Sequence, residues 1–204
     1  MPENSQKMTT LRQQTGPRVV ALAYDGLCTF EFGVAVEIFG LPRPEMGESW
    51  YRFAVAGVDE GELRATGGIR IVTDGNLSLL DDADLVIIPG WRGVDEPVPP
   101  ALCQALRVAN ARGCQVLTIC SGVFVLAATG LLDGRKATTH WRYTETLRQR
   151  YPAIDVLDDV LYHDAGLLLT SAGSAAGIDL CLYVIREDYG LEVANSVARR
   201  LVVQ

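Results

Sequence analysis

Short, almost continuous apolar runs separated by helical patterns constrain the fold of this chain more than any other feature. Residues 18–24 (RVVALAY), 85–89 (LVIIP) and 116–119 (VLTI) have the length of strands and few polar residues. Such runs are typical of strands that are buried on both faces of a parallel sheet. A helical pattern follows each run, and strands that alternate with helices join through right-handed crossovers. The chain is therefore predicted to be α/β, with a mostly parallel central sheet and helices on both faces.

The remaining segments complete this pattern within one domain. Residues 1–17 lack apolar periodicity and are expected to be a disordered tail. The length of 204 residues and the hydrophobic content of 49% suit a single core over residues 18–204. A further strand is predicted over 51–58 and a hairpin over 63–74. The other predicted elements are helices over 27–41, 97–112, 123–129, 143–151, 178–189 and 191–203, and short strand-like runs over 136–141, 154–157, 160–163 and 167–170.

Charge and cysteine usage narrow the possible functions. The net charge is −7 and the pI is near 4.8, which argues against direct contact with a nucleic-acid backbone. Five cysteines without CxxC pairs and only two histidines argue against a disulfide scaffold and against a metal site. No cofactor is expected. Residues 1–16 do not resemble a signal peptide and no segment has membrane-spanning length, so we expect a cytoplasmic protein without a membrane partner.

Residues 115–122 (QVLTICSG) predict a strand, a tight turn and a helix, with Cys120 at the corner. The corner aims the thiol at free N–H groups of the helix, where an anion is favoured. A free cysteine is only about 3% thiolate at neutral pH, and lowering its pKa by one unit takes about 1.4 kcal/mol. A helix N-terminus supplies roughly 0.3–1 kcal/mol. A second group must therefore assist Cys120, unless it is an inert, buried cysteine.

Several polar or glycine-rich positions follow predicted strands, as Cys120 does. Glu31 lies just beyond the first strand, residues 90–93 follow the strand over 85–89, and the small-residue loop over 171–177 follows another. In parallel sheets, ligands bind beyond the carboxyl ends of the strands. We therefore expect these positions to meet at one edge of the sheet, although Glu31 could instead serve only the dipole of its helix.

Five motifs stand out along the chain: YDGLCTFEF (24–32), DLVIIPGW (84–91), TICSG (118–122), ATTHW (137–141) and SAGSAAGID (171–179). Together they resemble the ThiJ/PfpI superfamily, which is related to the class I glutamine amidotransferases. Within it, the chain is similar to the amino-terminal domain of AraC-family transcriptional regulators of the GlxA/FtrA type, with isonitrile hydratase as an enzymatic relative. The resemblance implies a flavodoxin-like three-layer sandwich, commonly dimeric.

The resemblance implies that Cys120 is the cysteine of the elbow and that Glu31 is the acid that reaches it. A protonated Glu31 would donate a hydrogen bond to the thiolate, whereas an ionised Glu31 would raise the pKa of the thiol by repulsion. The two groups should therefore titrate as a coupled pair. Gly90 and the backbone N–H of Ser121 match the oxyanion-type donors of the family, and Ser174 is expected to join the ligand-binding residues.

Some positions depart from the family pattern or stay open. Trp91 replaces a glycine that many members carry, and is either a ligand contact or a hydrophobic plug. Ser121 replaces the histidine that follows the cysteine in peptidase-type members, which argues against a peptidase. His140 is the candidate base, or else a structural histidine bonded to the backbone. The other cysteines are interpreted as small hydrophobic residues; they are Cys28, Cys103, Cys114 and Cys181.

We therefore favour a regulatory domain that senses a small-molecule effector in a pocket around Cys120 and forms a homodimer. The last predicted helix ends one residue before Gln204, so we expect the chain to stop before a helix-turn-helix domain that makes the DNA contacts. The alternative is a cysteine-dependent hydratase or hydrolase, in which Cys120 attacks an electrophilic carbon and Glu31 transfers the proton. Sensing of oxidation through Cys120 is a third possibility.

Overall fold

The computed structural model describes residues 16–203, so most of the tail predicted over 1–17 lies outside the described residues. The last two residues of that segment pack against the domain. Gly16 is buried and its backbone N–H donates to the carbonyl of Glu48 at 3.0 Å. Among residues 16–203, no helix is long and apolar enough to cross a membrane.

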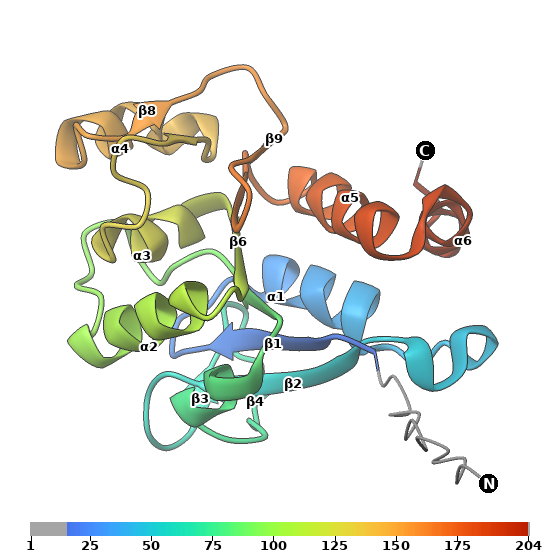
Figure 1. The fold of residues 1–204 in the computed structure, drawn as a ribbon. Helices are drawn as coiled ribbons and strands as arrows, with labels where there is room; N and C mark the ends of the chain where they lie inside the picture. Colours follow the sequence, from blue (N-terminus) through green and yellow to red (C-terminus); the bar gives the residue numbers. More distant parts are fainter. Residues whose placement is uncertain (1–15, 204) are drawn as a thin grey trace, which may run out of the picture.

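A six-stranded sheet in the order β2-β1-β5-β6-β10-β9 forms the centre of the fold (Figure 1). All neighbouring pairs are parallel except β10 and β9, which are antiparallel. The predicted mostly parallel sheet is thus confirmed. The strands are β1 (Arg18–Ala23), β2 (Arg52–Gly57), β5 (Leu85–Ile88), β6 (Gln115–Ile119), β9 (Tyr162–Asp164) and β10 (Leu168–Ser171).

Helices cover both faces of this sheet and complete the predicted three-layer sandwich (Figure 1). Side chains of α2, α3 and α4 pack into one hydrophobic core, whereas those of α1, α5 and α6 pack into the other. The helices are α1 (Thr29–Ala35), α2 (Pro100–Ala111), α3 (Val123–Ala128), α4 (Thr144–Arg150), α5 (Ala176–Tyr189) and α6 (Leu191–Leu201).

The apolar runs form the central strands because they supply both cores at once. In β1, Val20 and Leu22 belong to the core beneath α2 and α3, whereas Val19 and Ala21 belong to the core beneath α1 and α5. All four side chains are fully buried. Alternate residues of a strand point to opposite faces of the sheet, so a strand between two helical layers must be apolar on both.

Short elements account for most differences from the prediction. The helix predicted over 27–41 is α1 followed by a π-helical turn, η1 (Val36–Gly40). Two 3₁₀ helices, η2 (Pro44–Ser49) and η3 (Leu77–Asp82), were not predicted, because such short elements carry no recognisable period. The predicted hairpin contains β3 (Leu63–Arg64) and β4 (Arg70–Ile71). The remaining two strands, β7 (Lys136–Ala137) and β8 (Asp155–Val156), form a separate parallel pair.

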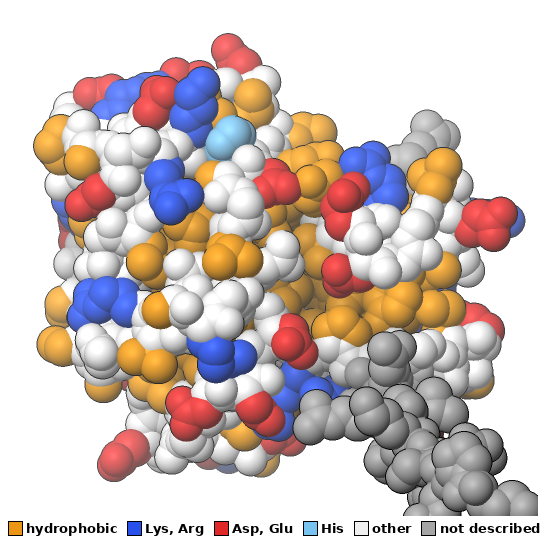
Figure 2. Space-filling view, viewed as in Figure 1, with side chains coloured by type: hydrophobic (Ala, Val, Ile, Leu, Met, Phe, Trp, Pro, Cys, Tyr) orange, Lys and Arg blue, Asp and Glu red, His pale blue; other side chains and the backbone are white. Residues whose placement is uncertain are grey.

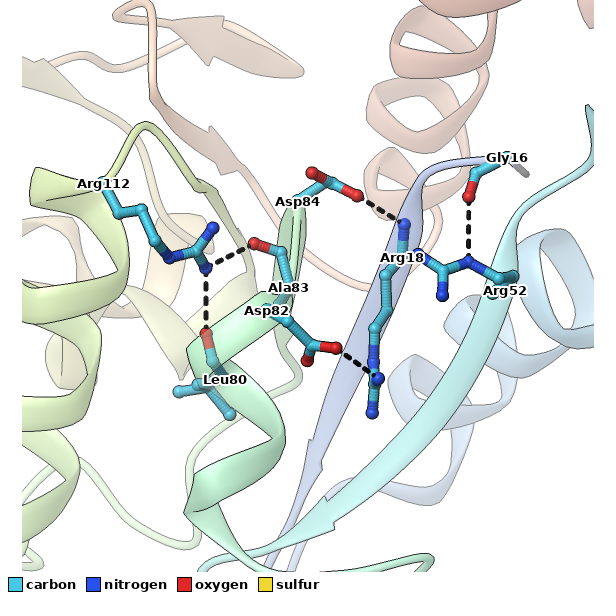
Figure 3. A network of polar contacts seen from close by, with 8 residues as sticks. All are labelled: Gly16, Arg18, Arg52, Leu80, Asp82, Ala83, Asp84 and Arg112. Carbon is cyan, nitrogen blue, oxygen red and sulfur yellow. Dashed lines mark hydrogen bonds and ion pairs between the residues drawn. The ribbon is translucent and has the colours of Figure 1, made fainter. Parts of the chain in front are cut away.

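Polar contacts secure the amino end of the sheet (Figure 3). The backbone N–H of Arg18 donates to the Asp84 carboxylate at 2.7 Å, and its guanidinium pairs with Asp82 at 2.6 Å. Arg112 donates from Nη2 to the carbonyls of Leu80 and Ala83 at 3.0 and 2.7 Å. These contacts tie β1 and α2 to the segment that enters β5, and they leave the carboxyl ends of the strands to the candidate site.

Candidate functional site

Cys120 lies at a sharp turn between β6 and the single 3₁₀ turn η4 (Cys120–Gly122), which continues into α3. Its φ of 56° is in the left-handed region, which costs a non-glycine residue roughly 1–2 kcal/mol. The hydroxyl of Thr139 donates to the carbonyl of Cys120 at 2.8 Å and helps to hold this conformation. The structure thus has the strand, turn and helix predicted for residues 115–122, with the thiol at the corner.

Gly122 lets the turn approach the neighbouring strand closely. A Cβ atom at this position would lie 2.4 Å from the carbonyl oxygen of Ile88 and 2.6 Å from that of Pro89. Both atoms belong to the backbone, so they cannot move aside as a flexible side chain would. Glycine is therefore required for α3 to begin directly against the end of β5.

Glu31 reaches the elbow from α1, across the carboxyl end of β1. Its side chain is only 2% exposed. Oε2 accepts a hydrogen bond from the backbone N–H of Gly90, Oε1 lies 3.2 Å from the donating hydroxyl of Ser174, and the carboxyl group also hydrogen-bonds the thiol of Cys120. Burial raises the pKa of Glu31 above its ordinary value, and these hydrogen bonds limit the rise. Residues 31 and 120 are therefore neighbours in a sheltered site.

The surroundings of Cys120 favour its protonated form. Burial raises the pKa of the thiol to about 12, and the negative charge of Glu31 contributes in the same direction. The backbone N–H of Ser121 donates to the sulfur and opposes this shift. In this arrangement the thiol holds the proton and Glu31 accepts its hydrogen bond. The protein environment therefore raises the pKa of Cys120 and does not lower it.

Two residues of the site were not identified from the sequence. Cys28 is half-buried and its thiol hydrogen-bonds Glu31, so it lies at the site, which its interpretation as a small hydrophobic residue did not anticipate. Cys28 and Glu31 are three positions apart at the start of a helix, and this spacing places side chains on one face. Tyr24 lies beneath the site, where its hydroxyl donates to the carbonyls of Pro89 and Gly90 at 2.6 and 3.0 Å.

Trp91 is buried against the protein. Its ring is 5% exposed and meets the ring of Tyr24 edge-on with centroids 4.6 Å apart. The guanidinium of Arg92 lies 4.5 Å from the centre of the indole, and Nε1 donates to the carbonyl of Glu96 at 3.1 Å. The hydroxyl of Ser121 donates to the carbonyl of Trp91 at 3.3 Å. This packing corresponds to the second of the two alternatives for Trp91, a hydrophobic plug.

His140 is placed by backbone contacts beside the small-residue loop. Its Nδ1 accepts a hydrogen bond from the backbone N–H of Arg142 at 3.2 Å, as the structural alternative expects. A Cβ atom on Gly173 would lie 2.7 Å from its Cδ2, which locates the ring next to this loop. Among the described residues, no hydrogen bond joins His140 to Cys120 or Glu31.

Exposure differs among the residues predicted to bind a ligand. Gly90, Trp91 and Ser121 are buried, whereas Ser174 is exposed. A hollow of about 730 Å³ is lined by Thr138, Thr139, Trp141 and residues 157–161, among others, but none of the predicted ligand residues lines it. Thr139 connects this hollow to the elbow, because its hydroxyl bonds the carbonyl of Cys120. Within residues 16–203, no group of three His, Cys, Asp or Glu residues is placed to hold a metal ion.

Comparison with known proteins gives consistent matches. The model of the DJ-1/PfpI family matches residues 17–187. CdhR, an HTH-type transcriptional regulator of Pseudomonas aeruginosa, is 36% identical over 153 residues, which are 75% of this chain and 45% of CdhR. Isonitrile hydratase of Pseudomonas putida is 36% identical over 119 residues, 58% of this chain and 51% of the enzyme. The chain thus spans about half the length of each of these relatives.

Solved structures support the same fold. The crystal structure of an AraC family transcriptional regulator from Pseudomonas putida superposes on the chain with a TM-score of 0.79 at 21% identity. The superposition covers 91% of this chain and 99% of that one. A likeness at this identity concerns the fold, and it agrees with the flavodoxin-like sandwich that the motifs imply.

Proposed function

The chain belongs to the DJ-1/PfpI family over residues 17–187, and from that premise we propose that it is a regulatory domain that senses a small molecule. The similarity to CdhR over 75% of the chain supports a role in transcriptional regulation. Sensing is favoured over catalysis because Cys120 is buried, and burial raises the pKa of its thiol to about 12. A thiol in this state is a poor nucleophile but a suitable hydrogen-bonding group for a ligand.

We place the effector site at the elbow, around Cys120, Glu31 and Ser174. Ser174 is exposed while its hydroxyl bonds the buried carboxyl of Glu31, so it provides a polar route from the surface to the site. In this proposal a ligand replaces the bond between Ser174 and Glu31 and contacts the donors around Cys120. DNA contacts come from a separate helix-turn-helix domain, and the protein acts as a cytoplasmic homodimer.

Protection of Cys120 from alkylation tests this proposal. A library of small metabolites is screened for compounds that slow the labelling of Cys120 by iodoacetamide, with Cys103 labelling in the same sample as the internal control. We expect an effector to protect Cys120 selectively and Ser174→Ala to weaken that protection. Protection that is equal in Ser174→Ala, or that extends equally to Cys103, would place the ligand elsewhere.

The homodimer is tested separately. Light scattering coupled to size-exclusion chromatography should give about twice the 22.1 kDa mass of the chain. A mass of one chain across the concentration range would contradict the dimer without affecting the proposed effector site.

A hydratase is the second candidate function, because isonitrile hydratase is 36% identical over 119 residues. In this reaction Glu31 accepts the thiol proton of Cys120 and passes it to the isonitrile carbon, which gains a bond to sulfur. Water then adds to that carbon, and the C–S bond breaks to release the formamide and restore the thiol. Incubation with a simple alkyl isonitrile should then yield the N-alkyl formamide in the wild type but not in Cys120→Ala. If no formamide above the Cys120→Ala background is detected by NMR, this candidate is excluded for that substrate.

A further inference from the structure

Arg43 is a buried charged residue whose donors are not all satisfied. Its side chain is almost fully covered, with the residue 4% exposed, and neither Nε nor Nη2 has a hydrogen-bond partner among residues 16–203. These two atoms form one edge of the planar guanidinium group, the edge that binds both oxygens of a carboxylate or phosphate. Buried polar groups are nearly always paired, so this free edge indicates an acceptor that the described residues do not provide.

A third donor without a partner lies next to it. The Nε1 atom of Trp50 is buried and has no hydrogen-bond partner in the described part of the chain. The guanidinium of Arg43 lies 5.0 Å from the centre of the Trp50 ring. The indole is held in place by stacking on Tyr189, with ring centroids 5.3 Å apart. All the unpaired atoms of this pair of residues are therefore donors, and a ligand that satisfies them must carry acceptors.

The charges around Arg43 do not neutralise it locally. Burial lowers the pKa of Arg43, and the positive charge of Arg200 acts in the same direction. Glu45 and Glu37 favour the charged form, but neither bonds Nε or Nη2. An arginine remains protonated in proteins, so the free edge stays a site of positive charge.

Two hollows flank Arg43, and their linings differ. One, of about 360 Å³, is lined by Arg43, Arg52 and Trp50 together with Pro42, Pro44, Gly47, Glu48 and Tyr51. The other, of about 180 Å³, lies between η2 and α6, where Figure 2 shows hydrophobic side chains in a hollow, and is lined by Arg43, Glu45, Met46, Glu192, Val193, Ser196 and Val197. The smaller hollow has two glutamates and one arginine, whereas the larger has two arginines and one glutamate, so the charge of the larger hollow favours an anion.

The larger hollow lies at the end of the sheet opposite to the elbow. Arg52 begins β2, whereas Cys120 follows the last residue of β6, and the sheet is parallel through these strands. Figure 3 shows the Nε atom of Arg52 donating to the carbonyl of Gly16, at 3.1 Å. This contact fixes Arg52 at the hollow, whose volume is in the lower range of small-molecule sites.

We propose that this hollow binds an anionic small molecule through its carboxylate or phosphate group. Nε and Nη2 of Arg43 form the paired hydrogen bonds, Nε1 of Trp50 donates a third, and Arg52 adds positive charge. The unpaired atoms are buried from water. An anion in the hollow therefore reaches them only when the guanidinium turns toward it on binding. The site is separate from Cys120, so it would be a second ligand site and does not depend on the proposed effector site.

Thermal unfolding in the presence of simple anions tests this inference. The full chain is melted in sodium phosphate, in sodium acetate and in sodium chloride of equal ionic strength. Phosphate or acetate should raise the melting temperature in a saturable manner, by about 5–10 °C at roughly one hundred times its dissociation constant. The two arms distinguish phosphate from carboxylate recognition. If neither anion stabilises the protein more than chloride does, the proposal is wrong.

Matched variants assign the effect to Arg43. Arg43→Met should abolish the anion response, whereas Arg199→Met removes the same charge from the exposed face of α6 and should leave it unchanged. Arg43→Lys keeps the charge but has no paired donors, and should lose most of the response; it also serves if Arg43→Met does not fold. An equal response in Arg43→Lys, or a response that persists in Arg43→Met, would overturn the proposed geometry.

Discussion

Replacing Glu31 by glutamine is predicted to make Cys120 more reactive. The amide has nearly the shape of the carboxyl group and keeps an oxygen that accepts the N–H of Gly90. It lacks the negative charge that, after burial, raises the pKa of Cys120 to about 12. The substitution therefore separates the charge of Glu31 from its role in packing.

The size of the effect follows from Coulomb's law. Two unit charges about 4 Å apart interact by about 4 kcal/mol at an effective dielectric constant of about 20, which corresponds to about 3 pKa units. This is an upper limit, because burial is the larger cause of the rise of the Cys120 pKa to about 12. Glu31→Gln should then lower the pKa of Cys120 by about one unit. At about pH 8 the thiolate fraction, and with it the alkylation rate, would increase about 10-fold.

The assay is alkylation by iodoacetamide across about pH 6–10, followed by mass spectrometry of the peptide that contains Cys120. Glu37→Gln, which removes a charge from the adjoining turn η1, is the control and should behave as the wild type. Slower or unchanged alkylation in Glu31→Gln would refute the reasoning. It would mean that Glu31 is the protonated partner and donates its hydrogen bond to a thiolate.

Three further predictions concern stability. Burial raises the pKa of Glu31 above its ordinary 4.5, so just above that pH the folded protein binds more protons than the unfolded chain, and the free energy of unfolding decreases as the pH rises through the window. Urea titrations should show this slope in the wild type and its loss in Glu31→Gln; a slope of opposite sign would disprove the shift. At the elbow, Cys120→Gly should be about 1 kcal/mol more stable than Cys120→Ala, because only glycine adopts a positive φ without strain, and the reverse order in urea unfolding would argue against a strained turn. Gly122→Ala should cost more than about 3 kcal/mol or prevent folding, since its Cβ would lie 2.4 Å from the carbonyl oxygen of Ile88. The matched change Gly33→Ala, in open space on α1, should instead stabilise by about 0.5–1 kcal/mol in thermal or urea unfolding; equal costs would contradict the packing argument.

The sequence predicts the central strands of the sheet better than the strand at its edge and the two-residue strands outside it. The runs that became β1, β5 and β6 were recognisable because a strand between two helical layers is apolar on both faces. The orientation of β9 and the pairing of β7 with β8 depend on contacts between distant segments, and two-residue strands carry no period of their own.

The candidate site was likewise predicted only in part. The proximity of Glu31 and Cys120 could be predicted because each follows a strand, and ligands bind beyond the carboxyl ends of parallel strands. The hydrogen bond of Cys28 and the burial of Trp91 depend on side-chain packing, which no local pattern encodes. The unpaired donors of Arg43 are likewise invisible in the sequence, because they are defined by the absence of a neighbour.

The pairing of Glu31 with Cys120 also makes the chain suitable for reassembly experiments. The tip of the β3–β4 hairpin at Gly67 and Gly68 has open space around both glycines, and it separates the two residues along the polypeptide. Two fragments divided there would each carry one half of the pair. The labelling rate of Cys120 depends on its contact with Glu31, so a change in that rate would report when the two fragments have associated.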